Sequence, residues 1–197
     1  MTAVMEADPE LEAFAHEVGT EGPVAIVGGR TRWELGGSGD PRARLVVAPA
    51  GVVEHRPEEM TVRVRAGTPV ADLHRALAGK GQRTALPERG GTVGGAVAVG
   101  ENHVEVRGRG RVRDAVLQMR YVGHGGEVVT CGGAVVKNVS GFNLPRLMVG
   151  ALGTLGLIAE VVLRTNPLPE VSQWVRQDDV DPVAVSDRLF RASAVLW

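Results

Sequence analysis

The chain has 197 residues, of which 44% are hydrophobic and 23% charged, so it resembles a globular protein with a sizeable core. Its 22 basic and 23 acidic residues give a formal net charge of −1, which leaves no global field to attract nucleic acid. No window approaches the roughly 20 uninterrupted apolar residues of a membrane span, and residues 1–10 lack secretory-signal features, so we expect a cytoplasmic protein.

The first half of the chain predicts an α+β unit. Asp8 can cap a helix whose first turn contains Pro9, and apolar side chains then recur at helical spacing up to Val18. A second helix is expected from Thr68 to Gly79. Three short strands lie between these helices: residues 24–27, 45–48 and 60–66.

The second half opens with a short helix rich in small residues, which Thr92 can cap. A hairpin and a buried strand follow, over residues 115–122, 127–131 and 157–164. A Pro-rich linker signal at residues 166–169 ends this half. Beyond it we expect a possible strand and a helix begun by Ser186.

Two glycine loops are the most distinctive local features of a chain in which roughly 14% of residues, 27 of 197, are glycine. One follows the first strand over residues 28–37, and the other opens a helix over residues 90–95. Such loops allow several backbone N–H groups to converge on a diphosphate without obstruction by side chains. Either loop alone could simply turn the chain, but the pair favours a nucleotide cofactor.

Other catalytic and metal-binding patterns are absent from the sequence. It contains no GxGxxG, GxxxxGK[ST], HExxH or GxSxG motif. The single cysteine, Cys131, excludes an internal disulfide and any cysteine-ligated cluster, so such a centre would belong to a partner. The five histidines form no close ligand pair, so we predict no metal site and identify no catalytic acid or base.

Four ordered motifs carry a resemblance to a known family. They are GGTVGG at residues 90–95, VRD at 112–114, VVKNVSGFNLPRLM at 135–148 and GTLG at 153–156. Together they resemble the FAD-binding (PCMH-type) domain of the vanillyl-alcohol oxidase and p-cresol methylhydroxylase superfamily, and most of all the FAD-binding subunit of glycolate oxidases. The resemblance covers about residues 20–168.

The resemblance implies an α+β, PCMH-type fold in which two α/β subdomains hold FAD between them. The expected divisions are a first subdomain at residues 1–88, a second at 89–168, and a linker with a truncated stub of the substrate (cap) domain at 169–197. Because the first loop has no histidine, we expect non-covalent FAD.

The resemblance also implies the residues that bind the cofactor. The first loop supplies Gly28, Gly29, Arg30, Thr31 and Arg32, and the second supplies Gly90, Gly91, Thr92, Val93, Gly95 and Ala96. Further candidates are Asp114, Asn138, Gly141 and Ile158. Arg30 stands where the family often has a third glycine, and its guanidinium could pair with the diphosphate or point to solvent.

The function implied by the resemblance is that of an FAD-binding subunit of a flavin-dependent oxidoreductase. It would oxidise a small 2-hydroxy acid such as glycolate, with hydride passing to flavin N5, and would need partner subunits that include an iron–sulfur subunit. The alternative is a non-catalytic FAD-binding or assembly module. A third reading, nucleic-acid binding by the arginines of residues 107–113, has little support because no aromatic residue lies among them.

Overall fold

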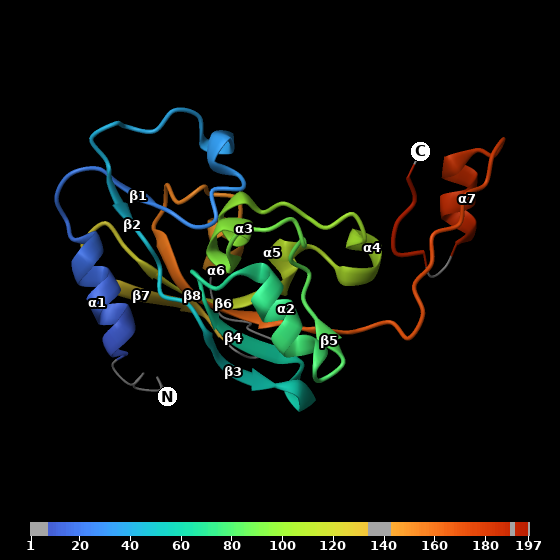
Figure 1. The fold of residues 1–197 in the computed structure, drawn as a ribbon, viewed down its shortest axis with the longest axis horizontal. Helices are drawn as coiled ribbons and strands as arrows, with labels where there is room; N and C mark the ends of the chain where they lie inside the picture. Colours follow the sequence, from blue (N-terminus) through green and yellow to red (C-terminus); the bar gives the residue numbers. More distant parts are fainter. Residues whose placement is uncertain (1–7, 134–142, 190–191, 197) are drawn as a thin grey trace.

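A five-stranded antiparallel sheet forms the centre of the molecule (Figure 1). The computed structural model describes residues 8–133, 143–189 and 192–196. In spatial order the strands are β3 (Val52–Arg56), β4 (Thr61–Arg65), β8 (Leu157–Arg164), β6 (Val116–Val122) and β7 (Val128–Gly132). The predicted hairpin is therefore β6 and β7, and the predicted buried strand at residues 157–164 is β8, which lies at the middle of the sheet.

The two faces of this sheet differ in chemistry because side chains alternate along each strand. Val62 and Val64 of β4 pair with Leu163 and Val161 of β8, and all four are buried in the apolar core. Their neighbours on the strands point the opposite way and are largely polar or charged. The sheet therefore has one apolar face, on which helices pack, and one polar face.

Three helices confirm the sequence predictions. In α1 (Pro9–Val18) the Asp8 side chain accepts a hydrogen bond from the Leu11 N–H at 3.3 Å. In α2 (Val70–Ala78) the predicted apolar face is fully buried, and α3 (Val93–Val99) is capped by Thr92. Helix α3 packs on β4 and β8, while α2 packs on β3 and β5 (Gln82–Arg83).

Two smaller sheets lie beside the central one. Strands β1 (Val24–Ile26) and β2 (Arg44–Val46) form a parallel pair, and the first glycine loop leaves β1 and enters the short helix η1 (Trp33–Gly36). Strand β5 pairs with β9 (Asn166–Pro167), where the linker was expected. After β9 the chain leaves the body and forms α7 (Pro182–Arg188), which projects from it in Figure 1.

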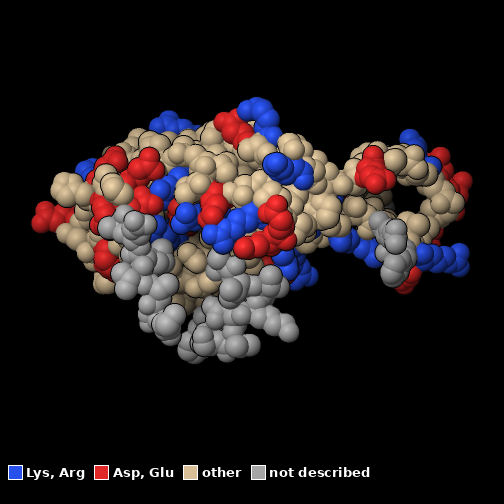
Figure 2. All heavy atoms as spheres, turned by 90° about the horizontal axis from the view of Figure 1, so that it is seen from below, with Lys and Arg blue, Asp and Glu red and all other residues tan. Residues whose placement is uncertain are grey.

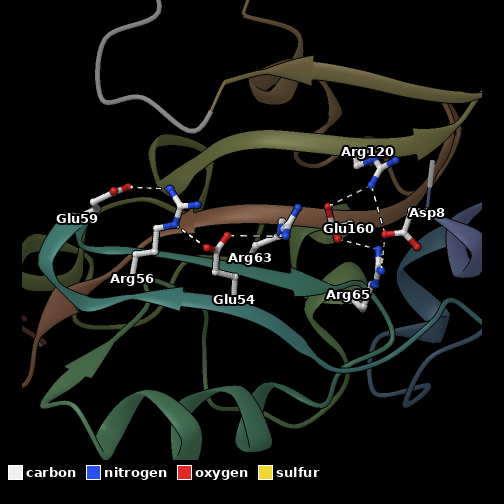
Figure 3. A network of polar contacts seen from close by, with 8 residues as sticks. All are labelled: Asp8, Glu54, Arg56, Glu59, Arg63, Arg65, Arg120 and Glu160. Carbon is white, nitrogen blue, oxygen red and sulfur yellow. Dashed lines mark hydrogen bonds and ion pairs between the residues drawn. The ribbon is translucent and has the colours of Figure 1, made fainter. Parts of the chain in front are cut away.

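The polar face of the sheet carries an ion-pair network (Figure 3). Arg65 lies 2.7 Å from Glu160 and 2.6 Å from Asp8, and Arg120 lies 3.5 Å from Asp8. Burial raises the pKa of Glu160, and the neighbouring arginines offset that effect only in part. Figure 2 shows acidic and basic side chains side by side on the surface rather than a field of one sign.

Several elements differ from the prediction. Strand β3 was not expected, because Glu54, His55 and Arg56 give it no apolar alternation and it lies at the edge of the sheet. The last helix begins after Asp181, whose carboxylate caps the Val183 N–H, and not at Ser186. No strand forms in the described part of residues 171–196.

Short helical segments complete the described chain: η2 (Pro57–Glu59), α4 (Val106–Arg109), α5 (Val112–Ala115) and α6 (Leu144–Met148). Within the described ranges, no helix combines the length and the apolar character that crossing a bilayer would require. The division at residues 88 and 89 stays a prediction, and the central sheet combines strands from both sides of it.

Candidate functional site

A cavity of about 390 Å³ lies where three segments meet. Its walls come from β1 and the first glycine loop, from the second loop and α3, and from the segment between Leu152 and Leu157. These segments are far apart in the sequence, so the cavity exists only in the folded chain.

The two glycine loops touch each other directly. A Cβ on Gly29 would lie 2.8 Å from the Cα of Gly91, and one on Gly28 would lie 2.5 Å from the Thr92 hydroxyl oxygen. Gly91 also has a φ of +80°, a left-handed conformation that side chains disfavour. Bare backbone is therefore required at this junction because a side chain would separate the loops.

The second loop is anchored to the rest of the domain by its backbone. The Val70 N–H donates to the carbonyl of Gly91 at 3.0 Å, and the Val93 N–H donates to Thr68 at 2.8 Å. The Gly94 N–H donates to the carbonyl of Ala66 at 2.7 Å. These bonds fix the loop against the end of β4 and the start of α2.

Backbone donors at the junction remain available for a ligand. We find no acceptor among the described residues for the N–H groups of residues 28–32, nor for those of Gly91 and Thr92. Consecutive amides of this kind can donate to phosphate oxygens. The arrangement therefore fits a diphosphate between the two loops.

Arg30 lies at the rim of the cavity with its guanidinium over an aromatic ring. Its Cζ atom is 5.6 Å from the centre of the Trp33 ring, a distance typical of a cation–π contact. Its φ is +54°, in the left-handed region. Glycine suits this position because it has no Cβ and adopts a positive φ without strain.

Arg32 is nine-tenths buried and joins the loops through its side chain. Its Nε donates to Glu101 at 2.8 Å, and its Nη1 donates to the Thr31 hydroxyl at 3.1 Å and the Gly90 carbonyl at 3.2 Å. Glu101 also contacts Arg89. The hydrogen bond from Arg32 lowers the pKa of Glu101, although burial opposes the shift.

The structure brings eight of the predicted cofactor residues together around the cavity: Gly28, Gly29, Arg30, Thr31, Arg32, Gly91, Thr92 and Gly95. Gly90 lies beside Thr31 and borders a second cavity, while Val93, Ala96 and Ile158 are buried in the core.

Asp114 pairs with Arg146 at 2.8 Å, and it is not among the residues that line the cavity. Asn138 and Gly141 lie outside the described residues. All these assignments to a cofactor remain predictions.

The third wall of the cavity was not among the predicted site residues. Leu152, Gly153 and Thr154 line it together with Leu157, and Trp33, Ala98 and Val99 add further contacts. The GTLG run was visible as a motif, but the sequence could not show where it folds. Leu152 and Gly153 have φ values of 52° and 79°, so the segment turns sharply at the cavity.

Side chains that could act as an acid or base near neutral pH are not found in the cavity lining described by the structure. The cavity lining found among the described residues includes no histidine, aspartate or glutamate. Burial raises the pKa of the Cys131 thiol to about 11, which makes it unreactive at neutral pH. The described ranges hold no group of three or more side chains suited to a metal ion.

Two arginines of the stretch at residues 107–113 make contacts within the protein. Arg109 is buried and lies 2.6 Å from Glu105 and 2.9 Å from Glu88. Arg107 is hydrogen-bonded to Ser186. The stretch therefore does not present a continuous basic strip.

Comparisons with known proteins support the sequence-based resemblance. The model of the family described as "FAD binding domain" matches residues 6–145. Glycolate oxidase subunit GlcE of Escherichia coli is 33% identical over 172 residues, covering 85% of this chain and 49% of that protein. Subunit GlcD of Bacillus subtilis is 32% identical over 127 residues, covering 62% and 27%.

Two further matches agree with these. D-2-hydroxyglutarate dehydrogenase of Xanthomonas citri is 34% identical over 115 residues, covering 56% of this chain and 24% of that protein. A solved structure of alkyldihydroxyacetonephosphate synthase aligns with a TM-score of 0.64 at 19% identity, covering 82% of this chain and 32% of that one. The chain thus spans about half the length, or less, of these relatives, and the expected α+β class is confirmed.

Proposed function

The chain belongs to the FAD-binding domain family, with FAD as its cofactor, and from that premise we propose that it is the FAD-binding part of a flavin-dependent oxidoreductase acting on a 2-hydroxy acid. The proposal also places the FAD diphosphate between the two glycine loops. Its substrate class follows from the relatives, whose names refer to glycolate and D-2-hydroxyglutarate.

One observation carries the placement of the cofactor. The first and second loops approach so closely that a Cβ on Gly29 would lie 2.8 Å from the Cα of Gly91, and residues of both loops line the same cavity. A ligand rich in phosphate oxygens fits this backbone cradle, because it needs donors and no side-chain bulk. Arg30 and Arg32 add positive charge at the same place.

The roles of this chain's residues follow from that geometry. Backbone N–H groups of residues 28–32 and 91–92 would bind phosphate oxygens, while the apolar residues Val24, Ile26 and Leu157 would exclude water from two of the walls. When bound, FAD supplies a hydride acceptor at flavin N5, and the protein positions it. No residue of the described cavity offers a general base, so any such group lies outside that set.

The test uses Gly95, an exposed residue of α3 that lines the cavity, where an added Cβ would contact only the Thr92 hydroxyl oxygen, at 3.3 Å, among the described residues. Alanine and valine both favour a helix over glycine, so Gly95→Ala and Gly95→Val should leave α3 folded. We expect FAD affinity to fall by about 10-fold and about 100-fold, respectively, because the new side chain enters the cradle. A fluorescence titration with FAD measures both.

Gly79→Ala is the matched control, since Gly79 has a right-handed conformation at the end of α2, and it is not among the cavity-lining residues. Its FAD affinity should equal that of the wild type. Wild-type affinity in a folded Gly95→Val protein would refute the placement of the cofactor.

We further propose that turnover requires other chains. With a single cysteine, these 197 residues cannot ligate a cysteine-bound iron–sulfur cluster, and we propose that a partner subunit supplies any iron–sulfur electron acceptor. Co-purification with candidate subunits, followed by a dye-reduction assay with glycolate and D-lactate, tests this. Dye reduction by the complex supports the proposal, and full activity of the isolated chain would contradict the need for a partner.

A second candidate function is a non-catalytic FAD-binding or assembly module. The absence of histidine and carboxylate side chains from the described cavity lining favours it. The two candidates separate in the same assay. If the flavin of every reconstituted complex stays oxidised with all 2-hydroxy acids tried, the chain is a module and not an oxidoreductase subunit.

A further inference from the structure

We propose that Glu101 is a positioning residue that joins the two glycine loops through Arg32 and Arg89, and that this contact sets the affinity for FAD. The inference rests on the proposed placement of FAD between the loops. We call the three residues Arg32, Glu101 and Arg89 the loop clamp.

The contacts of the loop clamp reach three segments at once. Glu101 follows α3, and its two carboxylate oxygens accept hydrogen bonds from Arg32 of the first loop, at 2.8 Å, and from Arg89 directly before the second loop. The Arg32 guanidinium also donates to the Gly90 carbonyl at 3.2 Å. One carboxylate thus holds both sides of the cradle.

The first loop needs such a contact because of where it begins. It leaves β1, which pairs with β2 in a two-stranded sheet separate from the central one. The second loop, by contrast, is bonded to Ala66 and Thr68 at the end of β4. The clamp therefore joins a loop on the small sheet to a loop on the large sheet.

The burial of these side chains supports a positional role. The Arg32 side chain is 10% exposed and that of Glu101 is 27% exposed, so this pair is largely shielded from water, whereas the Arg89 side chain is 71% exposed. An ion pair of this kind restricts both partners more than a fully exposed pair does. Loops already held at the right separation bind their ligand without the entropic cost of ordering them.

The sign of the charge gives a sharp test. A carboxylate close to a diphosphate site repels the ligand, so simple electrostatics predicts tighter FAD binding when Glu101 loses its charge. The loop clamp predicts the opposite, because both loops lose their common partner. The two explanations therefore differ in the direction of the effect and not only in its size.

The experiment compares FAD dissociation constants of the full chain carrying Glu101→Ala, Glu101→Gln or Arg32→Met with those of the wild type. We expect Glu101→Ala to weaken binding by about 10-fold, and Glu101→Gln to be intermediate, since a neutral amide oxygen can still accept one hydrogen bond. In an Arg32→Met background, Glu101→Ala should add less than about 2-fold, because the shared contact is already lost.

The matched control is Glu34→Gln in η1, a change that removes an exposed carboxylate of the first loop that is not among the cavity-lining residues and leaves the clamp intact. Its FAD affinity should stay within about 2-fold of the wild type or increase slightly. A second readout needs no ligand. Amide hydrogen exchange of the FAD-free protein should accelerate at residues 28–32 and 89–92 together in Glu101→Ala.

Unchanged or tighter FAD binding by Glu101→Ala would overturn the clamp while leaving the proposed cofactor site standing. Unchanged exchange in both loops would also overturn it, since the residue would then act only through charge. A wild-type protein that binds no FAD would refute the proposed site, and the role of the clamp in affinity with it.

Discussion

Arg30 shows how a single backbone angle can decide which residue suits a loop. Its φ of +54° lies in a region that most side chains avoid at a cost of about 1 kcal/mol, whereas glycine enters it freely. The guanidinium over Trp33 compensates in part, because an exposed cation–π contact contributes about 0.5–1 kcal/mol. The contact with Trp33 therefore offsets part of the backbone strain of Arg30 in the first loop.

Arg30→Gly and Arg30→Ala separate these two effects. Glycine removes the strain and the ring contact together, so we expect its free energy of unfolding to stay within about 1 kcal/mol of the wild type. Alanine keeps the strain and loses the contact, so it should be the less stable of the two variants. Urea unfolding measures the difference, and an alanine variant more stable than the glycine variant would contradict the account.

The FAD affinity of the same two variants tests whether the Arg30 guanidinium pairs with the diphosphate or points to solvent. If the Arg30 side chain remains on Trp33, both variants should bind FAD within about 10-fold of the wild type. A larger loss in both would mean that the guanidinium pairs with the diphosphate.

Among the elements, α2 combines an apolar face with a polar one that carries a partly buried histidine. His74 hydrogen-bonds Thr84 at 2.7 Å and lies 3.3 Å from Glu88, which in turn pairs with Arg109. Burial lowers the pKa of His74 below its ordinary value of 6.5, and Glu88 counteracts this only in part. Burial is also the main reason why the pKa of the nearby His103 is lowered.

These shifts predict a loss of stability in mild acid. The unfolded chain takes up protons near pH 6.5 while folded His74 stays neutral, so the stabilisation is present above that pH. It declines as the pH falls from there through the lower pKa of the folded state. We expect the melting temperature to drop over this window, and the drop to be smaller in His74→Gln.

His16→Gln on the exposed side of α1 is the control, and its pH profile should match that of the wild type. Melting curves recorded at several pH values test the expectation. An unaltered slope in His74→Gln would show that other groups cause the acid sensitivity.

Elements with a strong local pattern were predictable from the sequence. The caps at Asp8 and Thr92 and the buried face of α2 appear as expected, since each depends on neighbouring residues alone. Strand β3 was missed because its polar side chains are stabilised by pairing with β4, a contact that local periodicity cannot reveal. Helix α7 begins earlier than predicted because Asp181 caps it and Pro182 occupies its first turn.

The sequence predicted part of the candidate site, namely its two glycine loops. Glycine content and motif resemblance indicated the two loops, and both line one cavity. The segment from Leu152 to Thr154 and the clamp residue Glu101 could not be placed, because their proximity to the loops depends on tertiary packing. Ion pairs such as Arg32 with Glu101, 69 positions apart, leave no local signal.

At the scale of the whole molecule, the residues around the cavity bear on how the flavin is held. The cavity lining among the described residues contains no histidine, cysteine, tyrosine or aspartate, which are side chains that can form a covalent bond with a flavin ring. Acid precipitation of the FAD-loaded protein should therefore release all flavin into the supernatant. A pellet that keeps the flavin absorption would show a covalent bond and contradict this expectation.

The contact between α3 and the central sheet links the second glycine loop to the core. A Cβ on Gly94 would lie 2.7 Å from that of Ala66, and the Gly94 N–H is bonded to the Ala66 carbonyl. Any enlargement of Ala66 must therefore displace the helix that the second loop opens. Substitutions at Ala66 would therefore be limited by cofactor binding as well as by packing, although Ala66 is not among the cavity-lining residues.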